Sequence, residues 1–434
     1  MAEVRREVEG LIARLMGERE RKGRLDLEAS EALAKTVMLR CGVLVLEGVL
    51  AGEDGSSLGR SCRCGGQFQD RKRVGKTVLT VVGPLRLLRT VQRCSRCGSW
   101  RVAEDQVLDV EKTSFSPGVR RMLAETGAEV CFAKAKRMIA RLAGLDVTAK
   151  EVERVAEAVG AEIVGWEAGT SAAALESPAV LYLTADGTGI PVLKRETAGR
   201  KGKAADGIAR TREAKLGAVF TQTTTDAEGN PVRDSASTSY LGKIEAVENF
   251  GPRLYAEAVR RGVERAKQVV FIGDGATWLW NLAEEQFPGA VQIVDYYHAA
   301  EHLGALAQLL YPEDEMGRRR WRKPLEKLLW AGKIEELVGQ LREVRVRGRK
   351  REAMEKGISY LEKNQGRMRY GAFRRQGWFI GSGVVEAGCR SLIGGRLKQS
   401  GMHWTVGGAN AVLALRCCLE SGRFEDYWES RRVE

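Results

Sequence analysis

Long uncharged hydrophobic runs are missing from this sequence. No stretch of about 18 apolar residues without charge occurs, which excludes a membrane-spanning helix. The first residues, MAEVRREVEGLIARL, alternate charged and apolar side chains, so we do not expect a cleavable signal peptide. There is no internal repeat of fixed period, and no low-complexity tract beyond short basic runs.

Histidine is scarce, and cysteine is not arranged for disulfides. Only three histidines occur, and because no HExxH pattern is present we do not expect a helix-borne zinc site at His298 and His302. The nine cysteines are odd in number and mostly isolated or in close pairs, unlike the framework of a secreted domain. We therefore expect a cytoplasmic protein whose thiols are reduced or bound to metal.

Positive charge, in contrast, is abundant. The 434 residues carry a formal net charge of +13, and their 44% hydrophobic content excludes wholesale disorder. A length of this kind suggests two to four domains. The excess is concentrated in segments 194–215, 317–333 and 341–375, whose net charges are +5, +6 and +8. This excess of positive charge predicts a polyanionic binding partner. We expect nucleic acid first and anionic lipid second.

Periodicity and turn residues predict a multidomain α/β chain. Hairpin strands are expected at 76–82 and 85–91 with a turn at Gly83-Pro84, and later strands at 179–185, 216–223, 268–273 and 291–294. Helices are expected from Pro117 after the N-cap Ser116, over about 132–142, from the capping box Thr148–Glu151, and at 255–266, 278–286, 384–397 and 405–420. Strands alternating with helices place active groups at the carboxyl ends of strands.

Six segments result from these patterns. They are a helical region at 1–57 that could serve oligomerisation and ends in a linker at 52–57, a zinc-ribbon-like hairpin at 58–110, a helix-turn-helix-like DNA-binding domain at 111–172, the first part of an α/β core at 173–300, a basic helical insertion at 301–376, and closing core helices at 377–434. An ordinary helical spacer is the alternative for 111–172.

Two cysteine pairs flank the expected hairpin. Cys62 and Cys64 precede it, and Cys94 and Cys97 follow it, with glycines after each pair for tight turns. Four thiolates suit a closed structural Zn²⁺ site. A redox dithiol or unliganded buried cysteines are the alternatives. The remaining cysteines, Cys389 among them, are expected to be core residues.

Three acidic residues stand in contexts suited to metal chemistry. Asp186 and Asp274 each follow an apolar strand and precede glycine, and Glu386 lies in the first turn of a helix after Gly-Ser-Gly. Strand-end aspartates can share divalent ions such as Mg²⁺. The alternatives are ordinary Asp-Gly turns and, for Glu386, a simple ion pair with Arg390.

In order along the chain, ADGTGIPV, DGATW, DYYHAAEHL and GSGVVE resemble motifs of bacterial insertion-sequence transposases of the DDE type. The Kra-type group, related to Mutator-like transposases, is the most similar that we recognise, and the resemblance extends over about 58–420. It implies a ribonuclease-H-like catalytic core, interrupted by a helical insertion before the helix that carries the glutamate.

The resemblance also implies roles for residues. Asp186, Asp274 and Glu386 would bind two Mg²⁺ or Mn²⁺ ions, and His298 belongs to an Asp295-x-x-His298 element, for which a buried strand-to-helix junction is the alternative. The implied activity is binding of terminal inverted repeats, hydrolysis of the DNA ends and joining of 3′-hydroxyls to target DNA, in a homodimer or larger assembly at the bacterial nucleoid. A nuclease or resolvase without strand transfer, and a non-catalytic DNA-binding derivative, are the alternatives.

Basic side chains near these motifs are candidates for contacts with double-stranded DNA, and helices with solvated charged faces are the alternative. An aromatic candidate for base stacking follows the helix that carries the glutamate. The candidates are Arg195, Arg200, Lys201, Lys203, Arg210, Arg212, Lys215, Arg318, Arg319, Arg320, Arg322, Arg390, Arg396, Lys398 and Trp404.

Overall fold

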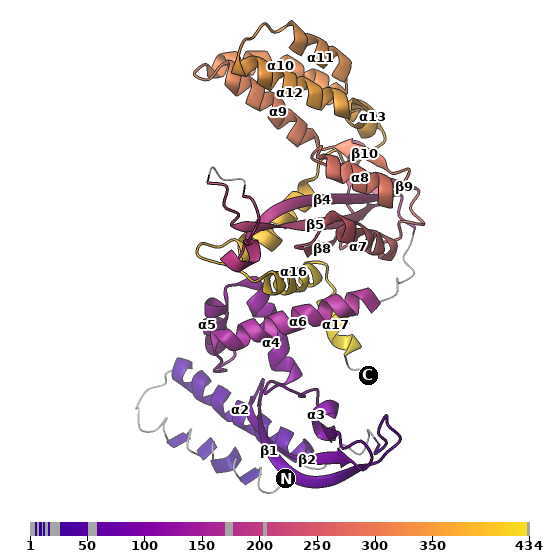
Figure 1. Ribbon diagram of the computed structural model, residues 1–434. Coiled ribbons are helices and arrows are strands. Elements are labelled where there is room, and N and C mark those ends of the chain that lie inside the picture. The colour runs from indigo at the N-terminus through magenta and orange to yellow at the C-terminus, as the bar shows by residue number, and fades with distance from the viewer. Residues whose placement is uncertain are drawn as a thin grey trace. The chain divides into compact units, whose positions relative to one another are not determined.

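The computed structural model describes residues 27–50, 59–169, 177–202 and 206–431, together with parts of 5–17 (Figure 1). The expected linker at 52–57 and Lys203 lie outside the described residues. The chain forms two compact units, Met1–Ala156 and Glu157–Glu434. In the described parts, no helix combines the length and the apolar character needed to cross a membrane.

A β-hairpin forms the centre of the first unit. Strand β1 (Phe68–Thr80) pairs antiparallel with β2 (Gly83–Cys94), and the short β3 (Trp100–Val102) pairs with β2. The sequence predicts this hairpin, but the turn lies at 81–82 and not at Gly83-Pro84. Gly83, with a φ of 128°, already pairs with the last residue of β1.

Local capping signals position the helices of the first unit. Its helices are α2 (Leu27–Leu50), α3 (Ala103–Val107), α4 (Pro117–Glu129), α5 (Phe132–Leu142) and the first part of α6 (Ala149–Gly169). The Ser116 hydroxyl accepts a hydrogen bond from the Val119 amide at the start of α4. Thr148 and Glu151 exchange backbone-to-side-chain hydrogen bonds of 2.8 and 3.2 Å, which confirms the predicted capping box. A helix-turn-helix role for these helices stays a prediction.

The second unit is built on a five-stranded mixed sheet with strand order β10-β9-β4-β5-β8. Its strands are β4 (Val180–Pro191), β5 (Thr211–Gln222), β8 (Ser239–Lys243), β9 (Gln268–Gly273) and β10 (Val291–Val294), and a separate ribbon joins β6 (Thr224–Thr225) to β7 (Pro231–Val232). β4, β5 and β8 are antiparallel neighbours, whereas β9 and β10 run parallel to β4. The expected strands at 268–273 and 291–294 are confirmed.

Helices cover both faces of this sheet (Figure 1). The helices of this unit outside the insertion are α7 (Val247–Arg260), α8 (Thr277–Gln286), α14 (Gly383–Gly388), α15 (Gly395–Leu397) and α16 (Val406–Glu420), with a π-helical turn at Cys389–Gly394. The last helix, α17 (Phe424–Ser430), packs against α16 and α6. On β5, a Cβ added to Gly217 would lie 2.9 Å from Leu254 of α7. The preceding residue, Leu216, lies 2.9 Å from a Cβ built on Gly388 of α14. Because neighbouring residues of a strand point to opposite faces, α7 and α14 lie on opposite sides of the sheet.

The helical insertion follows β10. Its elements are α9 (Tyr296–Leu310), α10 (Glu315–Ala331), α11 (Ile334–Glu343), α12 (Arg349–Asn364), the 3₁₀ turn Gln365–Arg367 and α13 (Tyr370–Arg375). A second 3₁₀ turn, Lys194–Thr197, lies between β4 and β5. Buried leucines such as Leu329, Leu337 and Leu361 belong to the same hydrophobic cluster as the sheet residues Phe271 and Ile293. The insertion and the sheet therefore share a core.

One predicted helix is misplaced. We expect a helix at 255–266, but α7 begins at Val247 and ends at Arg260. Pro252 lies inside α7, where a proline normally signals a helix boundary and so conceals the true start. Gly262, with a φ of 84°, follows the helix end.

Candidate functional site

The four hairpin cysteines converge on one point. Their sulfur atoms all lie within 4.8 Å of one another, with 3.7 Å between Cys62 and Cys97 and 3.5 Å between Cys64 and Cys94. Four thiolates placed tetrahedrally at about 2.3 Å from one ion would lie about 3.8 Å apart, so the spacing fits a metal ion. A Cβ on Gly66 would lie 2.7 Å from the Cys94 sulfur, so only glycine fits beside the cluster.

Protonation within this cluster is uneven. The pKa of Cys97 is lowered from 9.0 to about 6, first by the hydrogen bond with the Ser99 hydroxyl and then by the Ser99 backbone. The pKa of Cys94 is also lowered, chiefly by its hydrogen bond to the Cys97 backbone. The pKa of Cys64 is instead raised to about 11, because the hydrogen bond with the Gly66 backbone, which lowers it, is outweighed by Cys97, burial, Cys94 and Cys62. Thiolate is the form that ligates metal, so Cys97 and Cys94 reach that form most readily.

Asp186 and Asp274 come from two neighbouring parts of the central sheet. The parallel register pairs Thr184 of β4 with Ile272 of β9. Asp186 lies two residues after Thr184, and Asp274 lies two residues after Ile272. Asp186 therefore lies in β4 and Asp274 just after β9, toward the same end of the sheet, and the Asp186 side chain points to one face of the sheet. This face is the one that α14 covers, because Asp186 pairs with Leu216, which contacts α14.

The strand context of Asp186 differs from the expectation. Asp186 does not end its strand, since β4 continues to Pro191. The glycines after it do not form a turn, because Gly187 and Gly189 both pair with residues of β5. Asp274, in contrast, does precede a turn, because Gly275 has a φ of 101°.

Glu386 reaches the same region from α14, on the sheet face that carries Asp186. Its carboxylate is exposed, and its Oε1 lies 2.8 Å from the Ser382 hydroxyl. Cys389, one turn further, lies against Asp186: burial and then the Asp186 carboxylate raise the pKa of its thiol, and Glu386 adds to this. Cys389 is thus half-buried between two candidate acids, which corrects its expected place as a plain core residue.

The three acids share one region, but they are not tightly clustered. In the described ranges, the four cysteines are the only group of three or more His, Cys, Asp or Glu residues whose ligand atoms all lie within 4.8 Å of one another. The set formed by Asp186, Asp274 and Glu386 is therefore more open than the cysteine cluster.

The Asp295-x-x-His298 element lies where β10 meets α9. Asp295 is fully buried, and its Oδ1 accepts the His298 amide at 2.8 Å, so it caps α9. The His298 imidazole is partly exposed, with its ring centre 5.0 Å from that of His302. His302 packs on Tyr360, whose hydroxyl donates to the Asp274 carbonyl at 3.1 Å. A catalytic role for His298 stays a prediction.

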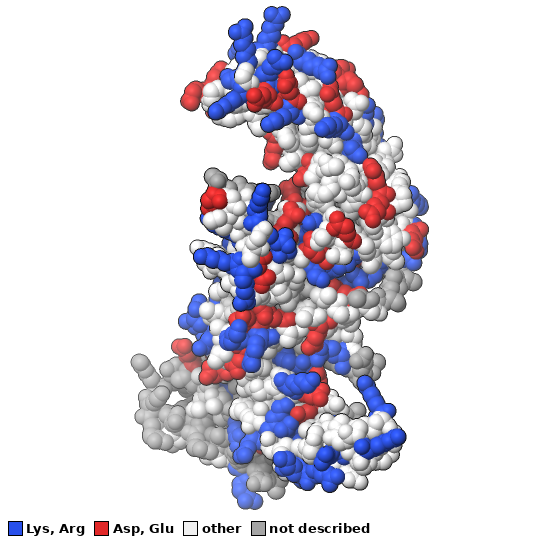
Figure 2. All heavy atoms as spheres, viewed as in Figure 1, with Lys and Arg blue, Asp and Glu red and all other residues white. Residues whose placement is uncertain are grey.

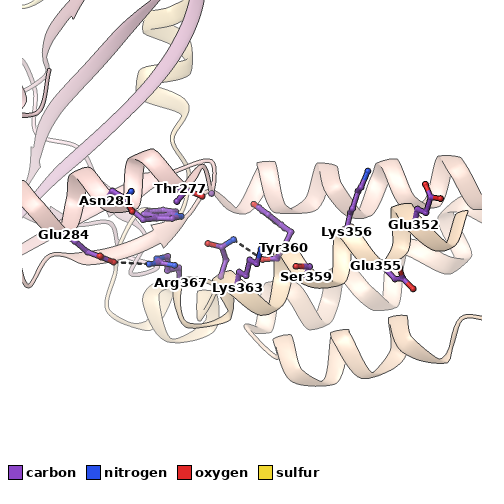
Figure 3. A pocket seen from close by; sticks show the side chains of 13 residues that line it. Thr277, Asn281, Glu284, Glu352, Glu355, Lys356, Ser359, Tyr360, Lys363 and Arg367 are labelled. Carbon is purple, nitrogen blue, oxygen red and sulfur yellow. Dashed lines mark hydrogen bonds and ion pairs between the residues drawn. The ribbon is translucent and has the colours of Figure 1, made fainter. Parts of the chain in front are cut away.

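A cavity of about 840 Å³ opens beside Asp274, between α8 and α12 (Figure 3). Arg367 lies over the Trp280 ring and forms a 3.5 Å ion pair with Glu284. Lys356, Lys363 and Arg367 in the lining are balanced by Glu284, Glu352 and Glu355. Because the charges balance, this lining gives no net attraction for a polyanion.

Several candidate DNA-contacting cations are exposed. Arg195, Arg200, Lys201, Arg319, Arg320, Arg390 and Lys398 face solvent. Others are already engaged: Arg210 pairs with Asp206, Arg212 donates to the Glu196 carbonyl, Arg318 donates to the Pro312 carbonyl, and Arg322 pairs with Glu326.

Three candidates are buried, which corrects their expected place on a DNA-facing surface. Arg396 has no exposed surface and lies over the Trp404 ring. The Trp404 indole donates to the Leu397 carbonyl at 3.0 Å. The Lys215 side chain is 10% exposed and binds Glu213. Trp404 has a structural role, because its backbone bonds to both Pro191 and Leu193 and fixes the segment after β4.

Two residues beside the candidate acids were not singled out from the sequence. Ser382 lies within the GSGVVE motif and contacts Glu386, and a serine four residues before a candidate acid is the signal that could have identified it. Tyr360 comes from the insertion, 86 positions from Asp274, and no local pattern marks it.

Comparison with known proteins gives little. No protein-family profile matches the chain, and no curated protein matches it. Among solved structures, the chain is similar to the Drosophila P element transposase strand transfer complex, with 8% sequence identity, a TM-score of 0.27, and coverage of 75% of this chain and 83% of that chain. Likeness at this level establishes neither the fold nor the function of this chain.

Proposed function

We propose that this chain is a DDE transposase of a bacterial insertion sequence. It binds the terminal inverted repeats, cleaves the DNA ends by Mg²⁺-dependent hydrolysis and joins the 3′-hydroxyl ends to target DNA. The observation that supports the proposal is that Cys389 lies near both Asp186 of β4 and Glu386 of α14, while Asp274 follows β9, the parallel neighbour of β4.

The sheet supports a ribonuclease-H-like core. The first three strands of this sheet in chain order, β4, β5 and β8, are antiparallel neighbours, and β9 and β10 then join the other side of β4 in parallel. In open sheets with parallel strands, active groups lie beyond the carboxyl ends of those strands, where Asp274 and Asp295 are found. The helical insertion begins directly after this point.

The donor set suits hard divalent ions. Carboxylate oxygens are the ligands that Mg²⁺ and Mn²⁺ prefer, and all three candidate acids supply them. When bound there, the ions supply Lewis acidity to the attacking and leaving oxygens of a phosphoryl transfer. Lys398 donates to the Thr188 hydroxyl, two residues beyond Asp186, and so presents an exposed cation to a DNA phosphate.

The cysteine cluster is proposed to hold one structural Zn²⁺. Four sulfur ligands, the 3.5 and 3.7 Å spacings and glycine turns support a closed site. Metal analysis of the purified chain should find one zinc per chain, and Cys62→Ser with Cys94→Ser should remove it. Full retention of zinc by that variant would exclude this site.

Exposed cations of the insertion are proposed to contact the DNA backbone. Figure 2 shows Lys and Arg side chains over this part of the molecule, interspersed with Asp and Glu. A hollow of about 900 Å³ between α9 and α10 is lined by Arg319, Arg320 and Lys323, among others. The positive charges of this hollow suit the phosphate groups of DNA. DNA affinity at such a site should fall as the salt concentration rises.

The test is a cleavage and strand-transfer assay with Mg²⁺ and DNA from the ends of the element. Asp186→Asn should lower the cleavage rate by roughly two orders of magnitude or more, because several kcal/mol of transition-state stabilisation are lost. Asp426→Asn, an exposed carboxylate of α17 in the same unit, is the matched control and should cleave normally.

Product analysis separates the outcomes. Joined products that depend on Asp186 support a transposase. Nicked DNA without joined products would replace the proposal with a nuclease, and binding without cleavage would replace it with a DNA-binding protein. Wild-type cleavage by Asp186→Asn would refute the assignment of the acid.

A further inference from the structure

The two ends of the helical insertion meet beside Glu386. The chain leaves the sheet at Asp295, forms the insertion and returns at Ile380, where the Ile380 carbonyl accepts the Tyr296 amide at 2.9 Å. Two residues later, Ser382 begins the segment that carries Glu386. The candidate acid is therefore adjacent to the junction that closes the insertion.

Asp295 joins both sides of this junction. It is fully buried, and while Oδ1 caps α9 by accepting the His298 amide, Oδ2 accepts the amide and the hydroxyl of Ser382, the latter at 2.6 Å. A buried carboxylate is stable only when its oxygens are satisfied, and the two backbone amides already provide one donor to each oxygen of Asp295, with the Ser382 hydroxyl as an additional donor. Asp295 thus fixes Ser382 from the opposite end of the insertion.

Ser382 also reaches Glu386. Its hydroxyl oxygen lies 2.8 Å from Glu386 Oε1 and 2.6 Å from Asp295 Oδ2. A serine hydroxyl has one hydrogen and donates to one carboxylate at a time. Asp295 Oδ2 keeps the Ser382 amide as a donor in either case, so the hydroxyl is free to orient Glu386.

We propose that Ser382, held by Asp295, is a positioning residue for Glu386 and makes divalent-ion binding at the acids depend on a closed insertion junction. The inference rests on the proposed function in its assignment of Glu386 as a metal ligand. Glu386 is exposed, and fixing a long exposed side chain costs conformational entropy that a pre-formed hydrogen bond reduces. Partners that orient metal ligands in this way commonly contribute 10–100-fold, as an order of magnitude, to affinity.

The test measures Mn²⁺ binding to the full chain without DNA, by electron paramagnetic resonance of free Mn²⁺. Ser382→Ala should raise the dissociation constant roughly 10–100-fold, and Ser382→Thr, which keeps the hydroxyl, should remain within about threefold of wild type. Ser391→Ala is the matched control, because the Ser391 hydroxyl donates to the Ala387 carbonyl of its own helical segment.

A second variant, together with a measurement of thermal unfolding, separates a loss of Mn²⁺ affinity from a loss of folding. Asp295→Asn retains an oxygen that can cap α9 but places an amide donor opposite the Ser382 amide, so it should weaken Mn²⁺ binding as Ser382→Ala does. Thermal unfolding is followed for each variant. Reduced Mn²⁺ affinity at an unchanged unfolding temperature supports positioning.

The two proposals fail differently. If Ser382→Ala and Ser391→Ala bind Mn²⁺ equally well, the positioning role is wrong, while the proposed function stands as long as Glu386→Gln abolishes DNA cleavage. If Mn²⁺ affinity depends on Ser382 but the wild-type chain cuts no DNA, the positioning role stands and the proposed function is wrong.

Discussion

Arginines six residues apart illustrate how burial decides a residue's role. Arg390 is exposed on the π-helical turn, whereas Arg396 is fully buried over Trp404. Both follow Glu386 closely in the sequence, and both are basic residues in a basic context. Charge alone therefore does not identify a DNA contact, because the alkyl part of arginine also packs in a core.

Arg396→Ala should destabilise the fold. Emptying a buried site of a long side chain costs roughly 2–5 kcal/mol, so the denaturation midpoint should fall markedly. Arg390→Ala should leave stability within about 0.5 kcal/mol of wild type and weaken DNA binding instead. Denaturant unfolding and DNA titration of both variants make the comparison, and normal stability of Arg396→Ala would contradict its structural role.

His302 should make stability depend on pH. Burial, and then the neighbouring His298, lower the pKa of His302 below its ordinary 6.5, so the folded state favours the neutral ring. Its contribution to stability is present above about pH 6.5 and is lost as pH falls through the folded-state pKa. Relative to His302→Gln, the wild-type chain should lose stability on acidification.

This pH effect is measured by urea unfolding of both proteins at several pH values between about 5 and 7.5. Nuclear magnetic resonance provides a direct check, because only three histidines occur in the chain and the variant assigns the His302 signal. A His302 ring that titrates above 6.5 would contradict the expectation.

At the scale of elements, close helix packing depends on single glycines. In α6, a Cβ on Gly160 would lie 2.0 Å from the Ala411 carbonyl oxygen of α16, whereas Gly165 of the same helix has nothing within 4 Å. The two glycines of this helix thus have different structural roles. The first permits contact between α6 and α16, and the second only lowers helix propensity.

Gly160→Ala should therefore destabilise the chain by about 1–3 kcal/mol or more, because the α16 backbone must move. Gly165→Ala should be neutral or stabilising by up to about 1 kcal/mol. Denaturant midpoints of the pair provide the measurement. Equal midpoints would show that α6 and α16 do not pack as closely as described.

Predictions of elements succeeded where the signal is local. The capping box at Thr148, the N-cap Ser116 and the strand at 268–273 depend on neighbouring residues, and all three are found. The start of α7 was missed because Pro252 hides it, and α17 was not predicted at all. In such cases packing against distant elements outweighs local preference.

At the scale of the whole molecule, the net charge of +13 predicts salt-dependent DNA binding. The affinity should fall steeply as salt rises. Arg320→Ala should reduce the slope of log affinity against log salt by about 1, because one phosphate contact is lost. Lys267→Ala, an exposed cation at the other end of β9 from Asp274, should leave the slope unchanged. If both variants showed the same slope of log affinity against log salt, Arg320 would not contact a DNA phosphate.

The sequence by itself determined the features that neighbouring residues encode: the cysteine pairs flanking a hairpin, the excess of basic residues, the helix caps and the motifs that contain Asp186, Asp274 and Glu386. Only the tertiary structure decided that Asp186 lies within a strand, that Cys389 lies against it, that Arg396, Lys215 and Trp404 are buried, and that Asp295 and Ser382 join the ends of the insertion beside Glu386. The reason is physical. Burial and contact depend on elements that are far apart in the chain, and a local pattern carries no information about which of them will meet.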